Sequence, residues 1–532
     1  MISRRKKSLI HFLNTLFLVS LLGSVPRSTQ AAEAKPFQDL SQTPPTAMEE
    51  GVLETFAFLV NTGQLDGFLK GTLKVLEYTP FVGGKVRAIP PETRKLGLHI
   101  GAEAVRMLVQ MRGEDAAYPE ITYLPWQQVS QWMERRLKAQ EEARSASFAN
   151  SVSDPRYYEE LLSLAEARES RARDLEILVN GPASFAKREE LIRQARKSID
   201  LMAWAILDDE TGFGLRDQLI AKHRAGVQVR VMVDNLVSQR PGYRQAVRDL
   251  AVAGIEVVRW RDKKVPFFGQ HRKMMIVDGT YMVAGGLNPG NTYSHKGVSE
   301  KDKWRDTDIY ATGEIVDEGN RLFAELWNAQ SATKLPPRVS FIRGGDIAIS
   351  LVNHKPDPRR QTGSTIMLSL LKAIRGAQKS VDIENAYVIL FPELEREIQK
   401  ALARGVRVRV LTNSDQSVDE AIVSQPLLIS SQRLARMGAD VYLRQGSTLH
   451  SKFLVIDNDL VAIGSYNLHP RSERVEGEMI FWIRDAKTAQ DFTHIFEKDL
   501  NPSIAKKATA EDIHPDLGFT VKFTLRYFYD LL

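Results

Sequence analysis

Cysteine is absent from the 532-residue chain. Its absence excludes disulfide bonds, thiolate metal sites and a lipid-modified N-terminal cysteine. A chain without thiols also has nothing to mispair in an oxidising compartment. Histidine is scarce as well, with ten residues, so the position of each histidine is informative.

Long apolar runs are restricted to the N-terminus. Basic residues at 4–7 are followed by an apolar run to Val25 and then by small residues. This order predicts a secretory signal peptide over residues 1–31, and therefore a periplasmic or secreted protein that can associate with a membrane surface. An uncleaved membrane anchor is the alternative, although His11 and Asn14 interrupt the run. No later segment is long and apolar enough to span a bilayer.

Excess positive charge is also nearly absent once this segment is set aside. The whole chain has a formal net charge of +6, but residues 1–31 carry five positive charges and no acidic residue, which leaves +1 for the remainder. Nonspecific nucleic-acid binding depends on many lysine and arginine contacts to phosphates. Nucleic acid is therefore not expected as a partner of a near-neutral chain.

The remaining chain divides by pattern. Residues 32–170 are rich in helix-forming and charged residues, which predicts a helical N-terminal region. From about residue 174, short β-branched strands alternate with helical runs, which is typical of an α/β fold built from βαβ units. Residues 501–532 end in an alternating segment, FTVKFTLRYFYDLL, that predicts a strand-like tail.

The α/β part contains an internal repeat. ARKSID, which begins at residue 195, returns as AQKSVD at residue 377, and GVQVRVMVDN returns as GVRVRVLTNS. This repeat predicts two similar halves, at residues 171–335 and 346–500, which are called half 1 and half 2 below.

One repeated segment carries polar side chains among apolar ones. QHRKMMIVDGTYMVAGGLN begins at residue 270 and LHSKFLVIDNDLVAIGSYN at residue 449. Five pairs of identical residues share a single offset of 179: His271/His450, Lys273/Lys452, Asp278/Asp457, Gly285/Gly464 and Asn288/Asn467. Chance does not give five such pairs at one constant offset, so the two segments are expected to serve one function.

The histidine and the lysine of each segment are two residues apart, so on a strand they point to one face. A single histidine in an apolar strand is more often a hydrogen-bonded core residue, but lysine is almost never buried without a partner. Two such pairs, together with Asn288, Asn467 and Ser465, predict a positive, donor-rich pocket for a phosphate group. A metal site is disfavoured because the lysines would repel a divalent cation, and no cofactor is expected.

Two histidines at a phosphodiester suggest a division of labour, in which one attacks phosphorus and the other moves the proton of the leaving or attacking oxygen. Asp278 and Asp457 are opposite to their histidines in strand parity and are expected to support the site. Asp306, Asp308 and Glu478 follow the motifs and are candidates to orient the imidazoles. Ordinary ion pairing is the alternative for these three acids.

These motifs resemble those of a known family. H-x-K-x-x-x-x-D followed by G-[GS]-x-N, present twice in one chain, resembles the phospholipase D superfamily. Within it, the segments GGLNPGNTY, WRDTDIYATG, IENAYVILFPEL and GSYNLHPRSERVEGEMIFWI resemble the bacterial cardiolipin synthase branch. The resemblance covers residues 174–500 and does not include the N-terminal region.

The resemblance implies an α/β fold in which two similar phospholipase D-like halves, with mixed or parallel sheets, form a pseudo-dimer around one metal-free active site. It implies that His271 is the nucleophile and His450 the general acid and base. A phosphatidyl group would then pass from His271 to water or to an alcohol such as a second phospholipid. Two residues depart from the family pattern: Glu476 replaces a common asparagine, and His469 replaces a frequent aspartate.

The leading interpretation is therefore a phosphatidyltransferase or phospholipase D that acts on membrane phospholipid from the non-cytoplasmic side. The run RWRDKKVPFFGQ (259–270) fits an anionic headgroup surface, and a solvated loop equally well. A secreted nuclease using the same histidines is the second interpretation, and a catalytically silent scaffold is the third. The histidine, lysine and asparagine present in both halves argue against a scaffold. The sequence leaves the oligomeric state open.

Overall fold

The computed structural model describes residues 56–60, 62–77, 102, 105, 134–139, 151–262, 268–336, 338–356 and 365–515. The predicted signal peptide, part of the run at 259–270 and the predicted strand in the tail lie outside these ranges. Within them, every helix is too short or too polar to cross a bilayer.

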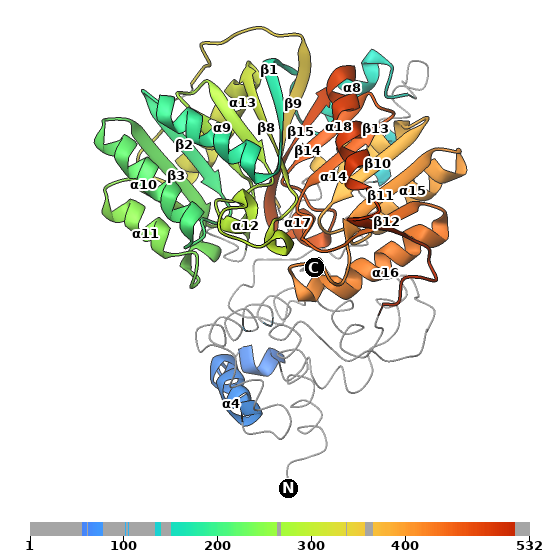
Figure 1. The fold of residues 1–532 in the computed structure, drawn as a ribbon, viewed down its shortest axis with the longest axis horizontal. Helices are drawn as coiled ribbons and strands as arrows, with labels where there is room; N and C mark the ends of the chain where they lie inside the picture. The colour runs from blue at the N-terminus through green and yellow to red at the C-terminus, as the bar shows by residue number, and fades with distance from the viewer. Residues whose placement is uncertain are drawn as a thin grey trace.

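Half 1, green in Figure 1, alternates strands with helices. Its strand Met274–Val277 is buried at every position, because helices cover both faces of the sheet. The elements of half 1 are β1 (Ser170–Val179), α9 (Asn180–Gln194), β2 (Ser198–Ala203), α10 (Glu210–Arg224), β3 (Gln228–Asp234), α11 (Gln245–Val252), β4 (Glu256–Trp260), β5 (Gly269–Gln270), β6 (Met274–Val277), β7 (Tyr281–Gly285), α12 (Asn291–Ser294), β8 (Thr307–Gly313) and α13 (Ile315–Gln330).

Half 2, orange to red in Figure 1, repeats this order of elements without a counterpart of the short β5 and adds one last strand, β16. Its elements are β9 (Ile347–His354), α14 (Thr365–Gly376), β10 (Ser380–Asn385), α15 (Pro392–Ala403), β11 (Arg407–Asn413), α16 (Ala421–Met437), β12 (Asp440–Arg444), β13 (Lys452–Ile456), β14 (Leu460–Gly464), α17 (Pro470–Arg474), β15 (Glu476–Arg484), α18 (Ala486–Asp499) and β16 (Ala505–Ala508).

The strands of both halves form one sheet of sixteen strands (Figure 1). β2, β3 and β4 pair in parallel, as do β10, β11 and β12, because helices connect these strands by crossovers. The two halves meet where β9 pairs antiparallel with β1 on one side and with β15 on the other. The predicted fold of two α/β halves with mixed pairing is confirmed, but the halves share a continuous sheet instead of packing two separate ones.

Three layers result from this sheet. One face of half 1 is covered by α9, α10 and α11, and the same face of half 2 by α14, α15, α16 and α8 (Pro155–Leu164). The opposite face is covered by α13 and α18, whose apolar residues belong to a single core cluster that extends across both halves. The shared cluster and the shared sheet fix the position of one half relative to the other.

The described parts of the N-terminal region are helical, as predicted, and include α4 (Leu65–Glu77) and α8 (Pro155–Leu164). Helix α8 begins at Asp154, whose carboxylate accepts a hydrogen bond from the N–H of Arg156 at 3.0 Å. The helix packs on half 2 through Tyr158, whose hydroxyl lies 3.0 Å from both the carbonyl of Trp482 and the hydroxyl of Ser350. Residues before half 1 in the sequence therefore complete the core of half 2.

Substitution of Trp482, on the central strand β15, measures how much this core contributes to the stability of the fold. Its indole is fully buried, and its N–H donates to the hydroxyl of Ser369 at 3.0 Å. We expect Trp482→Ala to lower the free energy of unfolding by about 3–5 kcal/mol, because it leaves a cavity beneath the sheet. Urea denaturation measures the loss, and Trp482→Phe is the control, expected to lose less. A loss below about 1 kcal/mol in the alanine variant would contradict the packing.

Candidate active site

His271 and His450 each stand just before a strand. His271 follows β5, and its N–H donates to the carbonyl of Gly477 in β15 at 2.9 Å. The N–H of His450 donates to the carbonyl of Arg305 at 2.7 Å, two residues before β13 begins. The prediction that each histidine lies inside a buried strand is wrong, because each one bonds to the opposite half instead of to a neighbouring strand of its own half.

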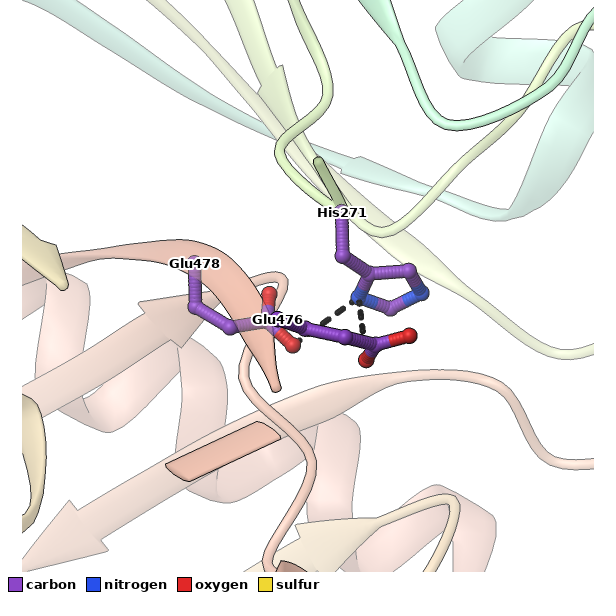
Figure 2. Close-up of side chains that lie close together, drawn as sticks. All are labelled: His271, Glu476 and Glu478. Carbon is purple, nitrogen blue, oxygen red and sulfur yellow. Dashed lines mark hydrogen bonds and ion pairs between the residues drawn. The ribbon is translucent and has the colours of Figure 1, made fainter. Parts of the chain in front are cut away.

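Each imidazole is also paired with a carboxylate from the opposite half. Nδ1 of His271 lies 3.0 Å from Oε1 of Glu478, and Figure 2 shows the ring pointing at that side chain. Nδ1 of His450 lies 2.6 Å from Oδ2 of Asp306. A carboxylate at Nδ1 holds a proton on that nitrogen and leaves Nε2 to meet a substrate. The structure therefore brings two of the three candidate acids to the histidines.

Lys273 and Lys452 lie beside the histidines and are 1% and 3% exposed. Each ammonium donates to the carbonyl of the histidine two residues before it. Burial lowers the pKa of Lys273 to about 7 and the pKa of Lys452 to about 8, against the opposing effect of nearby carboxylates. An entering phosphate oxyanion favours the charged form of both lysines, so the site is suited to an anion.

The same burial acts on the other ionisable groups. It lowers the pKa of His271 and His450 well below the usual range, and the lysine charges act in the same direction. Neutral imidazoles are the form required of a nucleophile. Burial raises the pKa of Asp306 to about 6 and also raises the pKa of Glu478, while a lysine charge opposes the shift in each case.

Aromatic rings that the motif analysis did not predict surround the two imidazoles. Trp204 meets His271 edge-on, with ring centroids 5.6 Å apart. Tyr293 and Trp304 lie against His450, with centroids 5.1 and 5.4 Å away. These rings exclude water from the histidines and leave few rotamers open to them. Two of the rings belong to the segments GGLNPGNTY and WRDTDIYATG, whose family resemblance was the available signal.

The three residues predicted to bind phosphate differ in their surroundings. The side-chain amide of Asn288 donates to the hydroxyl of Tyr293 at 3.2 Å. Asn467 is buried, and its Oδ1 has no hydrogen-bond partner among the described residues. The prediction for Ser465 is corrected, because its hydroxyl donates to Glu478 and accepts the N–H of Met479 at 3.1 Å. Ser465 thus holds the carboxylate that orients His271.

Asp278 and Asp457 lie at the far end of β6 and β13 from the histidines, where each follows the last strand residue with a φ near 53°. The carboxylate of Asp278 accepts N–H groups of residues 196–198 at 2.7–3.0 Å, and that of Asp457 accepts those of residues 378–380 at 2.7–2.8 Å. We expected both aspartates to support the site together with the catalytic histidines and lysines, and this expectation is corrected: they do not bond to the histidines, and they tie the turns ARKSID and AQKSVD to the following motif strands.

Asp308 is also placed away from the imidazoles. Its Oδ2 lies 2.7 Å from Nη2 of Arg188 and accepts the hydroxyl of Ser184 at 2.6 Å. Its Oδ1 accepts the N–H of Leu287 at 3.3 Å. The prediction that Asp308 orients a histidine is corrected, since its contacts are those of a buried ion pair that supports the loop after β7.

Glu476 approaches the same ring as Glu478, as Figure 2 shows. His271, Glu476 and Glu478 bring three possible metal-ligand atoms within 4.8 Å of one another. Glu476 lies 3.9 Å from Nδ1 of His271, but its other oxygen pairs with Nε of Arg471 at 2.8 Å. Glu478 is occupied by His271, Ser465 and a second serine hydroxyl. This donor set does not fit a resident metal ion, and both carboxylates are better suited to orienting the ring.

His469, the second departure from the family pattern, caps a helix. Its Nδ1 accepts the N–H of Ser472 at 3.0 Å at the start of α17. Aspartate side chains commonly accept the same bond, so the histidine preserves the local turn. Its ring also stacks on Tyr387, with centroids 5.6 Å apart and an interplanar angle of 10°.

The fold and site define a duplicated α/β protein in which two histidine–carboxylate pairs and two lysines lie together in one buried centre. Residues 189–327 and 370–500 match the family described as "Cardiolipin synthase, PLD-like domain", and the chain belongs to this family. The predicted family resemblance is thereby confirmed. The two matched segments carry His271 and His450 respectively.

Curated relatives agree with this assignment. The chain is 31% identical over 349 residues to "Cardiolipin synthase A" of Pseudomonas putida, covering 64% of this chain and 70% of that protein. It is 28% identical over 336 residues to "Cardiolipin synthase" of Halalkalibacterium halodurans, covering 61% of this chain and 65% of that one. The chain therefore spans about two thirds of the length of these relatives.

A solved structure shares the fold. Phosphatidylserine synthase of Haemophilus influenzae Rd KW20 superposes with a TM-score of 0.54 at 16% identity, covering 68% of this chain and 93% of that one. The likeness at this identity concerns the fold, and it extends over both halves together.

Because Asp278 holds a turn and does not contact the histidines, we expect its substitution to lower stability but not activity. Asp278→Ala removes the acceptor of three backbone N–H groups, and we expect a loss of about 1–3 kcal/mol in the free energy of unfolding. Turnover per folded molecule is expected to stay within about twofold, because the carboxylate does not contact the histidines. Thermal denaturation and activity at a permissive temperature measure the two effects. Asp457→Ala is the matched variant in half 2, and a large loss of turnover in fully folded protein would contradict the assignment.

The lowered lysine pKa values predict a pH-dependent affinity for anions. Both ammonium groups are charged below about pH 7 and become neutral as the pH rises through about 8. Sulfate keeps its charge over this range, so we expect its affinity to fall by about tenfold or more between pH 6 and pH 9. Calorimetric titration measures the affinity, with Lys273→Met and Lys452→Met as controls expected to bind weakly throughout. A constant sulfate affinity across this range would show that the lysines are not the anion ligands.

Proposed function

We propose that this chain is a phosphatidyltransferase of the phospholipase D type that acts on membrane phospholipid through a phosphohistidine intermediate. The observation that carries the proposal is the pairing of each imidazole with a carboxylate from the other half, beside two buried lysines. Such a centre binds a phosphodiester and supplies both a nucleophile and a proton carrier. The names of the relatives, cardiolipin synthase and phosphatidylserine synthase, support phospholipid as the substrate class.

The first step forms the covalent intermediate. Nε2 of His271 attacks phosphorus and the bond to the headgroup oxygen breaks, while His450 gives its Nε2 proton to that leaving oxygen. Glu478 stabilises the positive charge that develops on the His271 ring, and the two lysines stabilise the phosphate oxygens. His450 has to carry a proton at this point, and both Asp306 and the bound anion favour its protonated form.

The second step releases the product. His450, now neutral, removes a proton from water or from an alcohol, whose oxygen attacks phosphorus and breaks the bond to Nε2 of His271. Water gives phosphatidic acid, whereas the hydroxyl of a second phospholipid headgroup gives a lipid with two phosphatidyl groups. The aromatic rings around both imidazoles limit access of bulk water, which supports transfer to an alcohol over hydrolysis.

We further propose that the reaction takes place outside the cytoplasm and at a membrane surface. The pattern of residues 1–31 supports export, and phospholipid is the phosphodiester most available to an exported enzyme.

Product analysis tests the function. The purified chain is incubated with labelled phosphatidylglycerol, phosphatidylethanolamine or single-stranded DNA in the presence of a metal chelator. We expect a diphosphatidyl lipid as the main product and loss of at least about a thousandfold in rate for both His271→Ala and His450→Ala. Phosphatidic acid alone would identify a hydrolase of the same class.

Two outcomes would overturn the proposal. Cleavage of DNA, with lipid left unchanged, would make the chain a nuclease. Full activity in both alanine variants, or no turnover of any substrate by a folded wild-type chain, would remove the proposed mechanism. His223→Ala is a control, because this half-buried histidine in the last turn of α10 belongs to half 1 but not to the site.

A further inference from the structure

Arg305 of half 1 is inserted into half 2. Its side chain is 3% exposed and pairs with two acids of that half: Nε lies 2.7 Å from Oδ2 of Asp499, and Nη2 lies 3.2 Å from Oε1 of Glu384. Its remaining nitrogen, Nη1, donates at 2.6 Å to the carbonyl of Asp306 and to the hydroxyl of Thr307. One guanidinium thus joins the backbone of the residue that pairs with His450 to two acids of the opposite half.

The backbone of Arg305 holds the other member of the pair. Its N–H donates to the carbonyl of Thr448 at 2.9 Å, and its carbonyl accepts the N–H groups of His450 at 2.7 Å and Ser451 at 3.1 Å. Arg305 is therefore bonded to the segments of both His450 and Asp306. Arg305 itself takes no part in the chemical steps of the proposed mechanism.

The other histidine has a guanidinium in the equivalent place. Arg272, between His271 and Lys273, is fully buried, and Nε donates to Oδ1 of Asn353 at 2.8 Å while Nη2 donates to the carbonyl of His354 at 2.5 Å. A Cβ at Gly477 would lie 2.3 Å from Nη1 of Arg272, so this guanidinium requires glycine there. Gly477 precedes Glu478 just as Arg305 precedes Asp306.

The two half-sites therefore exchange the position that supplies the arginine. Ser451 stands between His450 and Lys452 where Arg272 stands in half 1, and Arg305 stands where half 2 has Gly477. At the His271 site, arginine follows the histidine and glycine precedes the carboxylate residue. At the His450 site, serine follows the histidine and arginine precedes the carboxylate residue. Each imidazole–carboxylate pair is accompanied by one guanidinium, and beside Arg272 there is no room for a side chain at Gly477.

We propose that Arg305 is a positioning residue that holds Asp306 against Nδ1 of His450, and that Arg272 does the same for Glu478 and His271. The effect of Arg305 on turnover rests on the proposed function, whereas its effect on the geometry and titration of His450 does not.

The electrostatics agree with this role. Burial raises the pKa of Asp306 to about 6, and the positive charges of Lys452, Arg305 and Lys273 oppose the shift. Removal of Arg305 takes away one of these charges, so the pKa of Asp306 rises further toward neutral pH. A protonated Asp306 no longer favours a proton on His450, and the acidic limb of the activity profile moves to higher pH.

The direct test uses three variants. Arg305→Gln is expected to lower kcat by about tenfold to a hundredfold with KM within about twofold, and to move the acidic limb of the kcat profile upward in pH. The double variant Arg305→Gly with Ser451→Arg rebuilds the arrangement of the other half-site. We expect it to recover most of the lost kcat and the wild-type pH profile, and Ser451→Arg alone to be worse than wild type because two guanidinium groups then compete for one place.

A matched control separates positioning from stability. Arg409 on β11 is as deeply buried as Arg305 and pairs with Asp382 through two contacts of 2.7 Å, away from the histidines. Arg409→Gln is expected to lose stability, measured by thermal denaturation, while kcat per folded molecule and the pH profile stay unchanged.

Histidine NMR keeps the test independent of substrate. In protein labelled with ¹⁵N-histidine, with His450 assigned through His450→Gln, Arg305→Gln is expected to shift the His450 resonances and its titration, and the double variant to restore them. Wild-type kcat and His450 titration in folded Arg305→Gln would overturn the proposal. A double variant that recovers stability but neither kcat nor the titration would also overturn it. Absence of lipid turnover in wild type would instead count against the proposed function.

Discussion

The active centre depends on two bonds that cross between the halves, from Glu478 to His271 and from Asp306 to His450. Contacts of 3.0 and 2.6 Å are kept only if the halves do not move relative to each other. The shared sheet satisfies this condition, because β15 carries Glu478 and pairs with β9, which in turn pairs with β1 of half 1. The backbone bonds of both histidines to the opposite half add a second tie. A duplicated chain thus builds one site that neither half contains alone.

The second constraint is the burial of charge around these pairs. A buried charge without compensation costs several kcal/mol, and ion pairs offset this cost for several of the groups around the site. Arg305 pairs with Asp499 and Glu384, and Glu476 pairs with Arg471. The lysines are the exception: burial lowers their pKa toward neutrality, and the nearby carboxylates oppose the shift without cancelling it, so further negative charge is needed to keep both ammonium groups ionised. A phosphodiester supplies that charge, so substrate binding and the ionisation of the lysines are coupled.

The sequence predicted the centre because the repeat was visible in it. A constant offset of 179 selected His271, His450 and their lysines, and all four lie in one site. The same offset also selected Asp278 and Asp457, which are repeated for a different reason: they hold the turns that precede β2 and β10. Cross-half contacts could not be predicted, since the bonded pairs are 207 and 144 residues apart and follow from the pairing of β9 with β15 and β1. Trp204 could not be predicted either, because no local pattern distinguishes it, whereas Trp304 and Arg305 lie in the segment WRDTDIYATG, whose family resemblance did not indicate their contacts.

The central claim is that the two histidines divide the chemistry, with His271 as the covalent carrier. Trapping tests it most directly: folded His450→Asn is mixed with a phosphatidyl ester of p-nitrophenol, whose leaving group needs no proton, and the protein is digested for mass spectrometry. We expect a burst of p-nitrophenol and a phosphatidyl adduct on the peptide that contains His271, and this adduct then breaks down slowly for lack of a base. An adduct on the peptide containing residue 450 in His271→Asn, with none on His271 in the first variant, would contradict it.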